Sequence, residues 1–201
     1  MASPETFISA TSDGLLQLNG QDNWAAARDG TTAGTISTSS STADCYGEQG
    51  TSGVYSVSRI FYVFDTSALP NDCTITAATL NLYCTSANGG GITVHAVQTS
   101  QSDPTNLVVA DFNNLSFTSG GSVAVTTTGA KTIDLNATGL TWINKTGNTL
   151  IGVIDARDQS NSSPSVGFIY DTFNMSEAAS NKPSLTVTYT LPSGGNFFSV
   201  L

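Results

Sequence analysis

The side chains that could carry out acid–base or nucleophilic chemistry are few in this chain. His95 is the only histidine, and it lies in the apolar run ITVHAVQ, which favours a surface or hydrogen-bonded core position over a catalytic base. Asp155 and Asp158 are the one carboxylate pair worth testing for hydrolysis, but Arg157 between them favours an ion pair that fixes a loop. The sequence has no Gly-x-Ser-x-Gly elbow, phosphate-binding glycine loop or Cys-x-x-Cys pair. We therefore expect a protein that is not an enzyme.

The remaining chemistry is that of binding. Asp155, Asp158 and Asp171 supply the oxygen ligands that a structural Ca²⁺ prefers, although their spacing does not resemble an EF-hand, and no other cofactor is indicated. Sugar binding requires exposed aromatic platforms beside amides and carboxylates. Trp24, which follows an Asp and an Asn in a loop, is the best candidate platform, and the alternative is an anchor buried at the end of the fold. The supporting aromatic candidates are Tyr46, Tyr55 and Tyr170.

The composition restricts the class of partner. The 201 residues contain 6 Lys and Arg against 15 Asp and Glu, a formal net charge of -9, so a nucleic-acid backbone would be repelled. No window approaches the ~18 consecutive apolar residues of a membrane helix, so we expect no membrane insertion. The first residues, MASPETFISATSDG, do not read as a secretory signal, so either the chain is not secreted or a leader was removed. Three cysteines in such a chain favour buried thiols over disulfides.

The apolar pattern predicts an all-β fold. In the run from residue 58 to 83, Ile60, Tyr62 and Phe64 point to one side of a strand while Phe61 and Val63 point to the other, as in a central strand with two buried faces. Short strands separated by turn residues are typical of a sandwich or jelly roll. We expect strands at 13–18, 54–65, 74–84, 92–98, 122–127, 131–135, 149–155, 165–170 and 185–191, with a weak edge strand at 36–42.

Two short helices and a tail complete the expected organisation. WAAAR at 24–28 suits one helical turn, and NATGLTWIN at 136–144 suits a helical lid that Asn136 caps and Trp142 packs onto the core. We expect an N-terminal arm at 1–12, a β-sandwich domain at 13–191 and an apolar tail at 192–201. The tail either folds back on its own domain or adds to a neighbour's sheet edge. Its candidate assembly anchors are Phe197, Phe198, Val200 and Leu201.

Several segments resemble one known family. They are RIFYVFD at 59–65 with the short Pro turn after it, ITAATLNLY at 75–83, TIDLNATGLTW at 132–142 and KPSLTVTY at 182–189. Together they are similar to the DNRLRE-type jelly-roll domain over about residues 13–190. The resemblance implies a jelly-roll β-sandwich of two antiparallel sheets with a short helical lid.

The same resemblance implies a choice between two functions. Members of this family occur as carbohydrate-binding modules, as cell-surface repeats and as structural proteins of bacteriophages. We expect a non-enzymatic virion component, such as a capsid decoration, head-fibre or tail-associated protein, that forms homo-oligomers or attaches to a particle assembled in the host cytoplasm. The alternative is an extracellular carbohydrate-binding module that recognises a cell-surface glycan.

Overall fold

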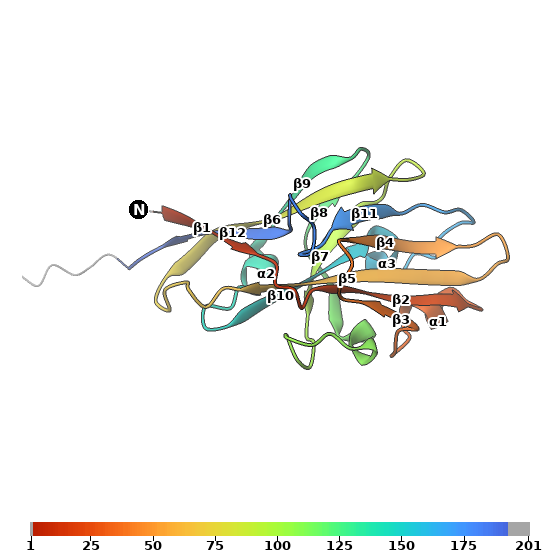
Figure 1. Ribbon diagram of the computed structural model, residues 1–201, viewed down its shortest axis with the longest axis horizontal. Helices are drawn as coiled ribbons and strands as arrows, with labels where there is room; N and C mark the ends of the chain where they lie inside the picture. The colour runs from red at the N-terminus through yellow and green to blue at the C-terminus, as the bar shows by residue number, and fades with distance from the viewer. Residues whose placement is uncertain (1, 193–201) are drawn as a thin grey trace, which may run out of the picture.

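The computed structural model describes residues 2–192 and shows a mostly β protein elongated along one axis (Figure 1). The strands are β1 (Ala2–Ile8), β2 (Gly14–Gln21), β3 (Thr35–Ser37), β4 (Thr42–Gln49), β5 (Tyr55–Asp65), β6 (Thr74–Ala87), β7 (Thr93–Thr99), β8 (Leu115–Ala124), β9 (Gly129–Asp134), β10 (Asn148–Asp155), β11 (Asp171–Asn174) and β12 (Ser184–Thr190). The helices are α1 (Trp24–Arg28), the 3-10 helix η1 (Val109–Asn113), α2 (Ala137–Leu140) and α3 (Ala156–Ser160).

The strands form one curled antiparallel sheet. Its main path runs β1-β12-β6-β11-β4-β5-β10-β7-β8, while β9 pairs with β6, and β2 pairs with β5 and β3. Strand β4 joins the two halves of this sheet, because residues 42–45 pair with β11 and residues 46–49 pair with β5. The half that contains β6 and β12 therefore curls over the half that contains β5, β10 and β7.

The main hydrophobic core lies between these two halves. It takes Leu80, Leu82 and Leu185 from one half and Ile60 and Ile151 from the other. A second cluster lies on the opposite face of β5, where Phe61 packs under α1 and η1. Strand β5 is therefore buried on both faces, which confirms the prediction from its unbroken apolar run.

The curl closes where β8 meets β9 and α2. The backbone N–H of Asn136 donates to the carbonyl of Gly120 at 2.7 Å. At Gly121, whose φ is +150°, an added Cβ would lie 2.4 Å from the carbonyl oxygen of Asp134. Glycine is required here because the two backbones approach more closely than any side chain allows.

Several elements agree with the sequence analysis. Helix α1 covers the predicted residues, and the side chain of Asn136 accepts from the N–H groups of Thr138 and Gly139, so the predicted cap of α2 is confirmed. The predicted buried thiols are also confirmed, because Cys45, Cys73 and Cys84 are buried and unpaired. Trp142 is buried and packs against Gly120 beside α2.

Three expectations were wrong. Residues 2–8 are not part of an arm, because β1 pairs with β12 from Ala2 to Ile8. No strand spans 165–170, where Val166 and Gly167 form isolated bridges, that of Gly167 being to Gln49, and the strand begins at Asp171 instead. The polar segment 19–53, in which one helical turn and a weak edge strand at 36–42 were the only elements expected, also contains the sheet-joining strand β4.

Two further predictions concern the C-terminal tail and the membrane. The predicted anchors Phe197, Phe198, Val200 and Leu201 lie outside the described residues. Among residues 2–192, none of the helices has the length and apolar character to cross a bilayer.

Candidate functional site

His95 contacts a serine on the neighbouring strand. Its Nδ1 lies 2.8 Å from the Oγ of Ser119 on β8, and burial lowers the pKa of His95 while Asp155 opposes that decrease. The Ser119 Oγ also lies 3.1 Å from the carbonyl and 3.3 Å from the N–H of Gly121, so it fixes the bulge in β8. Within the described residues, no carboxylate hydrogen-bonds to His95. The pair therefore lacks the orienting group of a catalytic triad.

The Asp155–Arg157 pair stabilises the start of α3. Asp155 is the N-cap: its Oδ1 accepts from the N–H of Arg157 at 2.6 Å and from its Nε at 2.9 Å, while Oδ2 accepts from Nη2 at 2.5 Å. Arg157 Nη2 also lies 3.4 Å from the carbonyl of Ile169. Both oxygens of Asp155 are thus used by the arginine beside it, as the loop-fixing interpretation predicted.

A buried clamp joins β5 to α3. The guanidinium of Arg59, on β5, donates from Nε and Nη2 to the two oxygens of Asp158 at 2.8 and 2.9 Å, and both side chains are completely buried. Arg59 also donates to the carbonyls of Phe112 and Arg28 at 2.8 and 2.6 Å. Burial raises the pKa of Asp158, and the charges of Arg59 and Arg28 oppose that rise. The clamp holds α3, η1 and α1 on the outer face of β5.

Aromatic rings complete the clamp. The guanidinium of Arg28 lies 3.7 Å from the ring centroid of Phe117, and that of Arg59 lies 4.3 Å from that of Phe112. Arg28 also donates from Nε to the backbone carbonyl of Asp158 at 2.8 Å. Arg28 also pairs through Nη1 with Asp29 at 2.6 Å, and the Asp29 side chain is 51% exposed, but the other partners of the two arginines described above lie inside the fold. The cluster therefore stabilises the structure.

The predicted calcium ligands do not form a cluster. Asp155 and Asp158 are each paired with an arginine, and among the described residues no group of three acidic, Cys or His side chains is arranged to hold a metal. Asp171 is buried, and its Oδ2 accepts from the N–H of Ile92 at 3.1 Å while Oδ1 has no hydrogen-bond partner. Burial raises the pKa of Asp171 to about 6. The geometry thus does not support the Asp155, Asp158 and Asp171 site.

Trp24 is the buried anchor that the sequence left open as its alternative role, and it is not an exposed sugar platform. Its side chain is 8% exposed and belongs to the cluster under α1. The indole N–H donates to Asn161 at 3.1 Å, and an added Cβ at Gly47 would lie 2.9 Å from the ring. The other three candidates, Tyr46, Tyr55 and Tyr170, are half-buried.

These tyrosines do not form one platform. Tyr55 packs on Trp24 with ring centroids 6.3 Å apart, and the Tyr46 hydroxyl donates to Asn19 at 3.1 Å. Burial raises the pKa of Tyr46, and Glu48 adds to that rise. The side chains of Tyr46 and Tyr55 therefore each have a structural partner.

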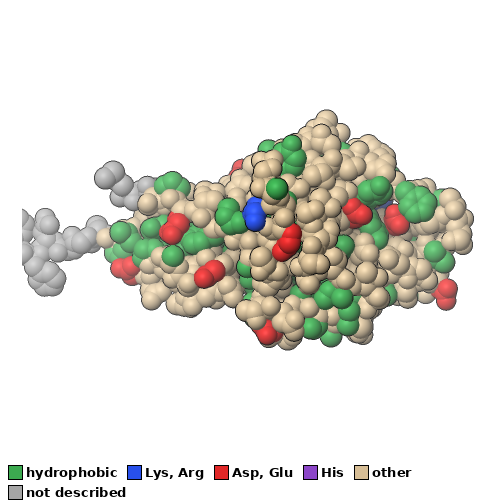
Figure 2. All heavy atoms as spheres, in the orientation of Figure 1, with side chains coloured by type: hydrophobic (Ala, Val, Ile, Leu, Met, Phe, Trp, Pro, Cys, Tyr) green, Lys and Arg blue, Asp and Glu red, His purple; other side chains and the backbone are tan. Residues whose placement is uncertain are grey.

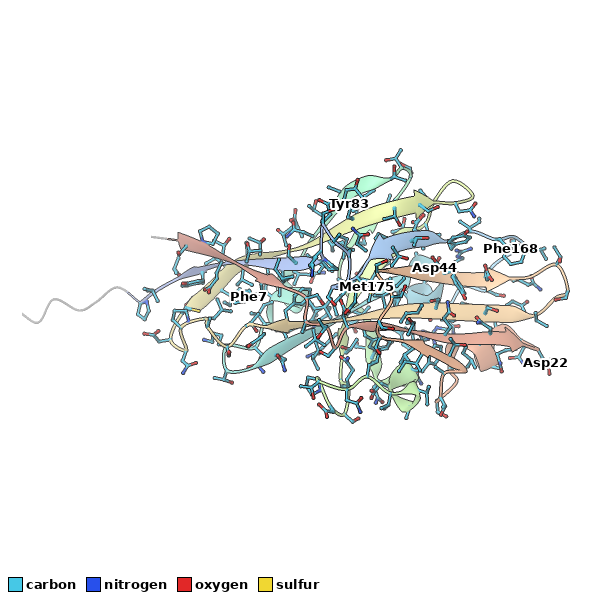
Figure 3. All side chains as sticks on the ribbon, viewed as in Figure 1. Phe7, Asp22, Asp44, Tyr83, Phe168 and Met175 are labelled. Carbon is cyan, nitrogen blue, oxygen red and sulfur yellow. The ribbon has the colours of Figure 1, made fainter. Side chains whose placement is uncertain are left out.

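Residues that the sequence did not single out form a pocket on the β6–β9 half of the sheet. The pocket has a volume of about 190 Å³ and is lined by Asn81, Leu82, Tyr83, Ala130, Asn181 and Lys182. Figure 3 shows Tyr83 on this half of the molecule. An aromatic ring beside two amides and an ammonium group suits a polar organic ligand. The alternation along β6 could have shown that Asn81 and Tyr83 share one face, but their proximity to residues 181 and 182 is a tertiary effect.

Exposed apolar side chains occur at both ends of the long axis. At one end the loop after α3 carries Val166 and Phe168, which are 59% and 58% exposed, and Figure 3 labels Phe168 there. The N–H of Gly167 donates to the carbonyl of Gln49 at 3.0 Å, which holds this loop on β4. At the other end Leu191, 56% exposed, follows β12. Figure 2 shows hydrophobic side chains at both ends of a largely uncharged surface.

The fold and these surfaces define an antiparallel, mostly β protein. No family model and no curated protein matches the chain. Among solved structures it is similar to Mud crab tombus-like virus, with 12% identity over 96% of this chain and 81% of that chain and a TM-score of 0.31. It is also similar to the K1 cleaved adhesin domain of Lys-gingipain from Porphyromonas gingivalis, with 12% identity over 96% of this chain and 99% of that chain and a TM-score of 0.29.

Proposed function

We propose that this protein is a non-enzymatic structural protein, a jelly-roll β-sandwich that assembles with copies of itself or attaches to a particle. The observation that carries the proposal is the placement of the three most exposed large apolar side chains of the described residues at opposite ends of an elongated body. Leu191 lies at one end, and Val166 and Phe168 lie at the other. Covering these apolar side chains with a partner would remove their surface from water, which favours association.

The distribution of charge supports the same proposal. The two most buried arginines, Arg28 and Arg59, hold α1, η1 and α3 on β5, so these two cations are used inside the fold and not on its surface. An elongated body that presents apolar groups at its ends is suited to bridging neighbours. Because several segments resemble the DNRLRE-type family, we propose that the particle is a bacteriophage virion and that the protein is located there.

The test compares end variants in an assembly assay. Light scattering on the purified chain is expected to give a mass above that of the monomer, and the double variant Val166→Ser with Phe168→Ser is expected to reduce it. Deleting residues 192–201 is expected to reduce it as well, while the domain stays folded by circular dichroism. Ile36→Ser is the matched control, because Ile36 is an exposed apolar residue on β3, which pairs with β2 and not with the loop of Val166 and Phe168. Assembly that is normal in all the end variants would exclude these contacts.

The pocket supports a second candidate function, the binding of a glycan. The side chains of Tyr83, Asn81, Asn181 and Lys182 offer a ring to stack on a sugar and groups to hydrogen-bond its hydroxyls. We expect binding on a glycan array to be lost in Tyr83→Ala and kept in Trp24→Phe, since Trp24 is buried. Binding that survives Tyr83→Ala would exclude the pocket as a glycan site.

The contact between His95 and Ser119 permits a direct test of the non-enzymatic assignment. A serine activated by histidine reacts with a fluorophosphonate probe. We expect no labelling of Ser119, because its hydroxyl is hydrogen-bonded to the backbone of Gly121. Labelling that disappears in His95→Ala would show a hydrolase instead.

A further inference from the structure

Two carboxyl groups and one hydroxyl are packed together where the chain crosses between the halves of the sheet. Asp13 precedes β2, and Ser176 and Glu177 lie in the loop between β11 and β12. Ser176 Oγ lies 2.9 Å from Oδ1 of Asp13 and 2.8 Å from Oε1 of Glu177. Asp13 Oδ2 accepts from the N–H of Ser176 and from the hydroxyl of Ser9, each at 3.0 Å.

The hydrogens in this cluster can be counted. A serine hydroxyl carries one hydrogen, so Ser176 can donate to only one of the two carboxyl groups. The second short oxygen–oxygen contact then needs a hydrogen from a carboxyl group, because two ionised oxygens and a hydroxyl supply only one. Asp13 is completely buried, and Glu177 Oε2 is buried without a hydrogen-bond partner. One proton shared between the two acids satisfies both contacts.

The surroundings of Asp13 provide no compensating cation. The ionisable groups that face it are Glu177 from the β11–β12 loop and the phenol of Tyr62 from β5. Asp13 takes part in none of the salt bridges among the described residues. Burial raises the pKa of Asp13 to about 6, against the lowering by the hydrogen bonds from Ser176 and Ser9.

We propose that Asp13, Ser176 and Glu177 form a proton-dependent clasp that holds β1 in the sheet. The clasp pins the β1–β2 connection, in which the N–H of Ser9 also donates to the carbonyl of Pro183 at 2.9 Å. When the shared proton leaves, the buried carboxylate of Asp13 and the half-buried carboxylate of Glu177 face each other across one hydroxyl, and the connection loosens. Because β1 is the outermost strand beside β12, its release uncovers the β12 edge for pairing with another chain. At weakly acidic pH β1 therefore covers the β12 edge, and at neutral pH β1 is released from it more readily.

The sign of the effect follows from linkage. The acid is ionised above about pH 4 in the unfolded chain and above about pH 6 in the fold, so the stabilisation is complete below pH 4 and is lost as the pH rises through 6. The interval of about two pH units corresponds to an increase of up to ~100-fold in the opening of β1.

Two measurements on the full chain test the clasp. Carbon NMR of the side-chain carboxyl groups is expected to show Asp13 titrating near pH 6. Hydrogen exchange of the β1 amides that pair with β12, corrected for intrinsic rates, is expected to accelerate between pH 5 and pH 7. This acceleration is expected to disappear in Asp13→Asn and to persist in Asp22→Asn, whose carboxylate is exposed.

The outcomes that overturn the clasp are distinct. Titration of Asp13 below about pH 4.5 would show that the two acids share no proton. Corrected exchange of β1 that is the same at pH 5 and pH 7 would show that the cluster does not hold the strand. The NMR titration uses the unaltered chain, so it decides the first point even if Asp13→Asn does not fold.

Discussion

Replacing Asp158 by alanine is expected to destabilise the fold strongly, because it leaves the Arg59 guanidinium buried without its counter-ion. The substitution removes two charge-assisted hydrogen bonds of 2.8 and 2.9 Å. It leaves the bonds from Arg59 to the carbonyls of Phe112 and Arg28 in place. These carbonyls supply partial charges only, so the positive charge of Arg59 stays uncompensated.

The size of the effect follows from the burial of the pair. Breaking a buried ion pair by removing one partner costs about 3–5 kcal/mol, whereas an exposed pair contributes about 0–1 kcal/mol. Both side chains are completely buried, so we expect the larger range for Asp158→Ala and for Arg59→Met. The double variant removes both charges together, so its loss is expected to be smaller than the sum of the single losses by at least ~2 kcal/mol.

Urea unfolding followed by tryptophan fluorescence measures these free energies, since Trp24 and Trp142 are both buried in the fold. Asp29→Ala is the matched control, because Asp29 pairs with Arg28 at the surface and its loss is expected to cost less than about 1 kcal/mol. Single losses of less than 1 kcal/mol at Asp158 and Arg59, or losses that add in the double variant, would refute the clamp.

Four further variants test other features of the structure. Trp24→Ala is expected to cost about 3–5 kcal/mol in urea unfolding and to leave glycan binding unchanged, because the ring is a core anchor. Asn136→Ala is expected to cost about 1 kcal/mol, measured in the same way, through loss of the α2 cap. In the unaltered chain the raised pKa of Asp171 makes the unfolding free energy decrease as the pH rises through 6, and Asp171→Asn is expected to make this decrease smaller. Gly91→Ala is expected to lower the melting temperature more than Gly90→Ala, since both glycines have positive φ but only at 91 would the Cβ meet a backbone carbonyl, at 1.5 Å.

The sequence predicted those parts of the fold that depend on local pattern. The apolar run of β5 was sufficient to place a central strand, and Asn136 followed by helix-compatible residues was sufficient to place the cap of α2. Each of these features depends on a run of about ten neighbouring residues. The strand β4 was missed because its residues alternate only weakly between polar and small side chains. Its pairing with β5 and β11 decides its structure.

The candidate site was harder to predict because it depends on partners distant in the sequence. Asp158 was a plausible metal ligand from its neighbours alone, and only the fold brings Arg59 to it across 99 residues. Trp24 lies beside polar residues that suggest exposure, but in the fold α1 places its ring in the apolar cluster on the outer face of β5. The pocket at Tyr83 likewise combines residues from β6, β9 and the segment before β12.

The mass of the chain in solution tests the central proposal most directly. Multi-angle light scattering across a range of concentrations is expected to show a species heavier than the 20.7 kDa monomer, and the double variant at Val166 and Phe168 is expected to shift it toward the monomer. A single 20.7 kDa species at every concentration, with binding only to a glycan, would contradict an assembly role and favour the pocket at Tyr83 as the functional surface.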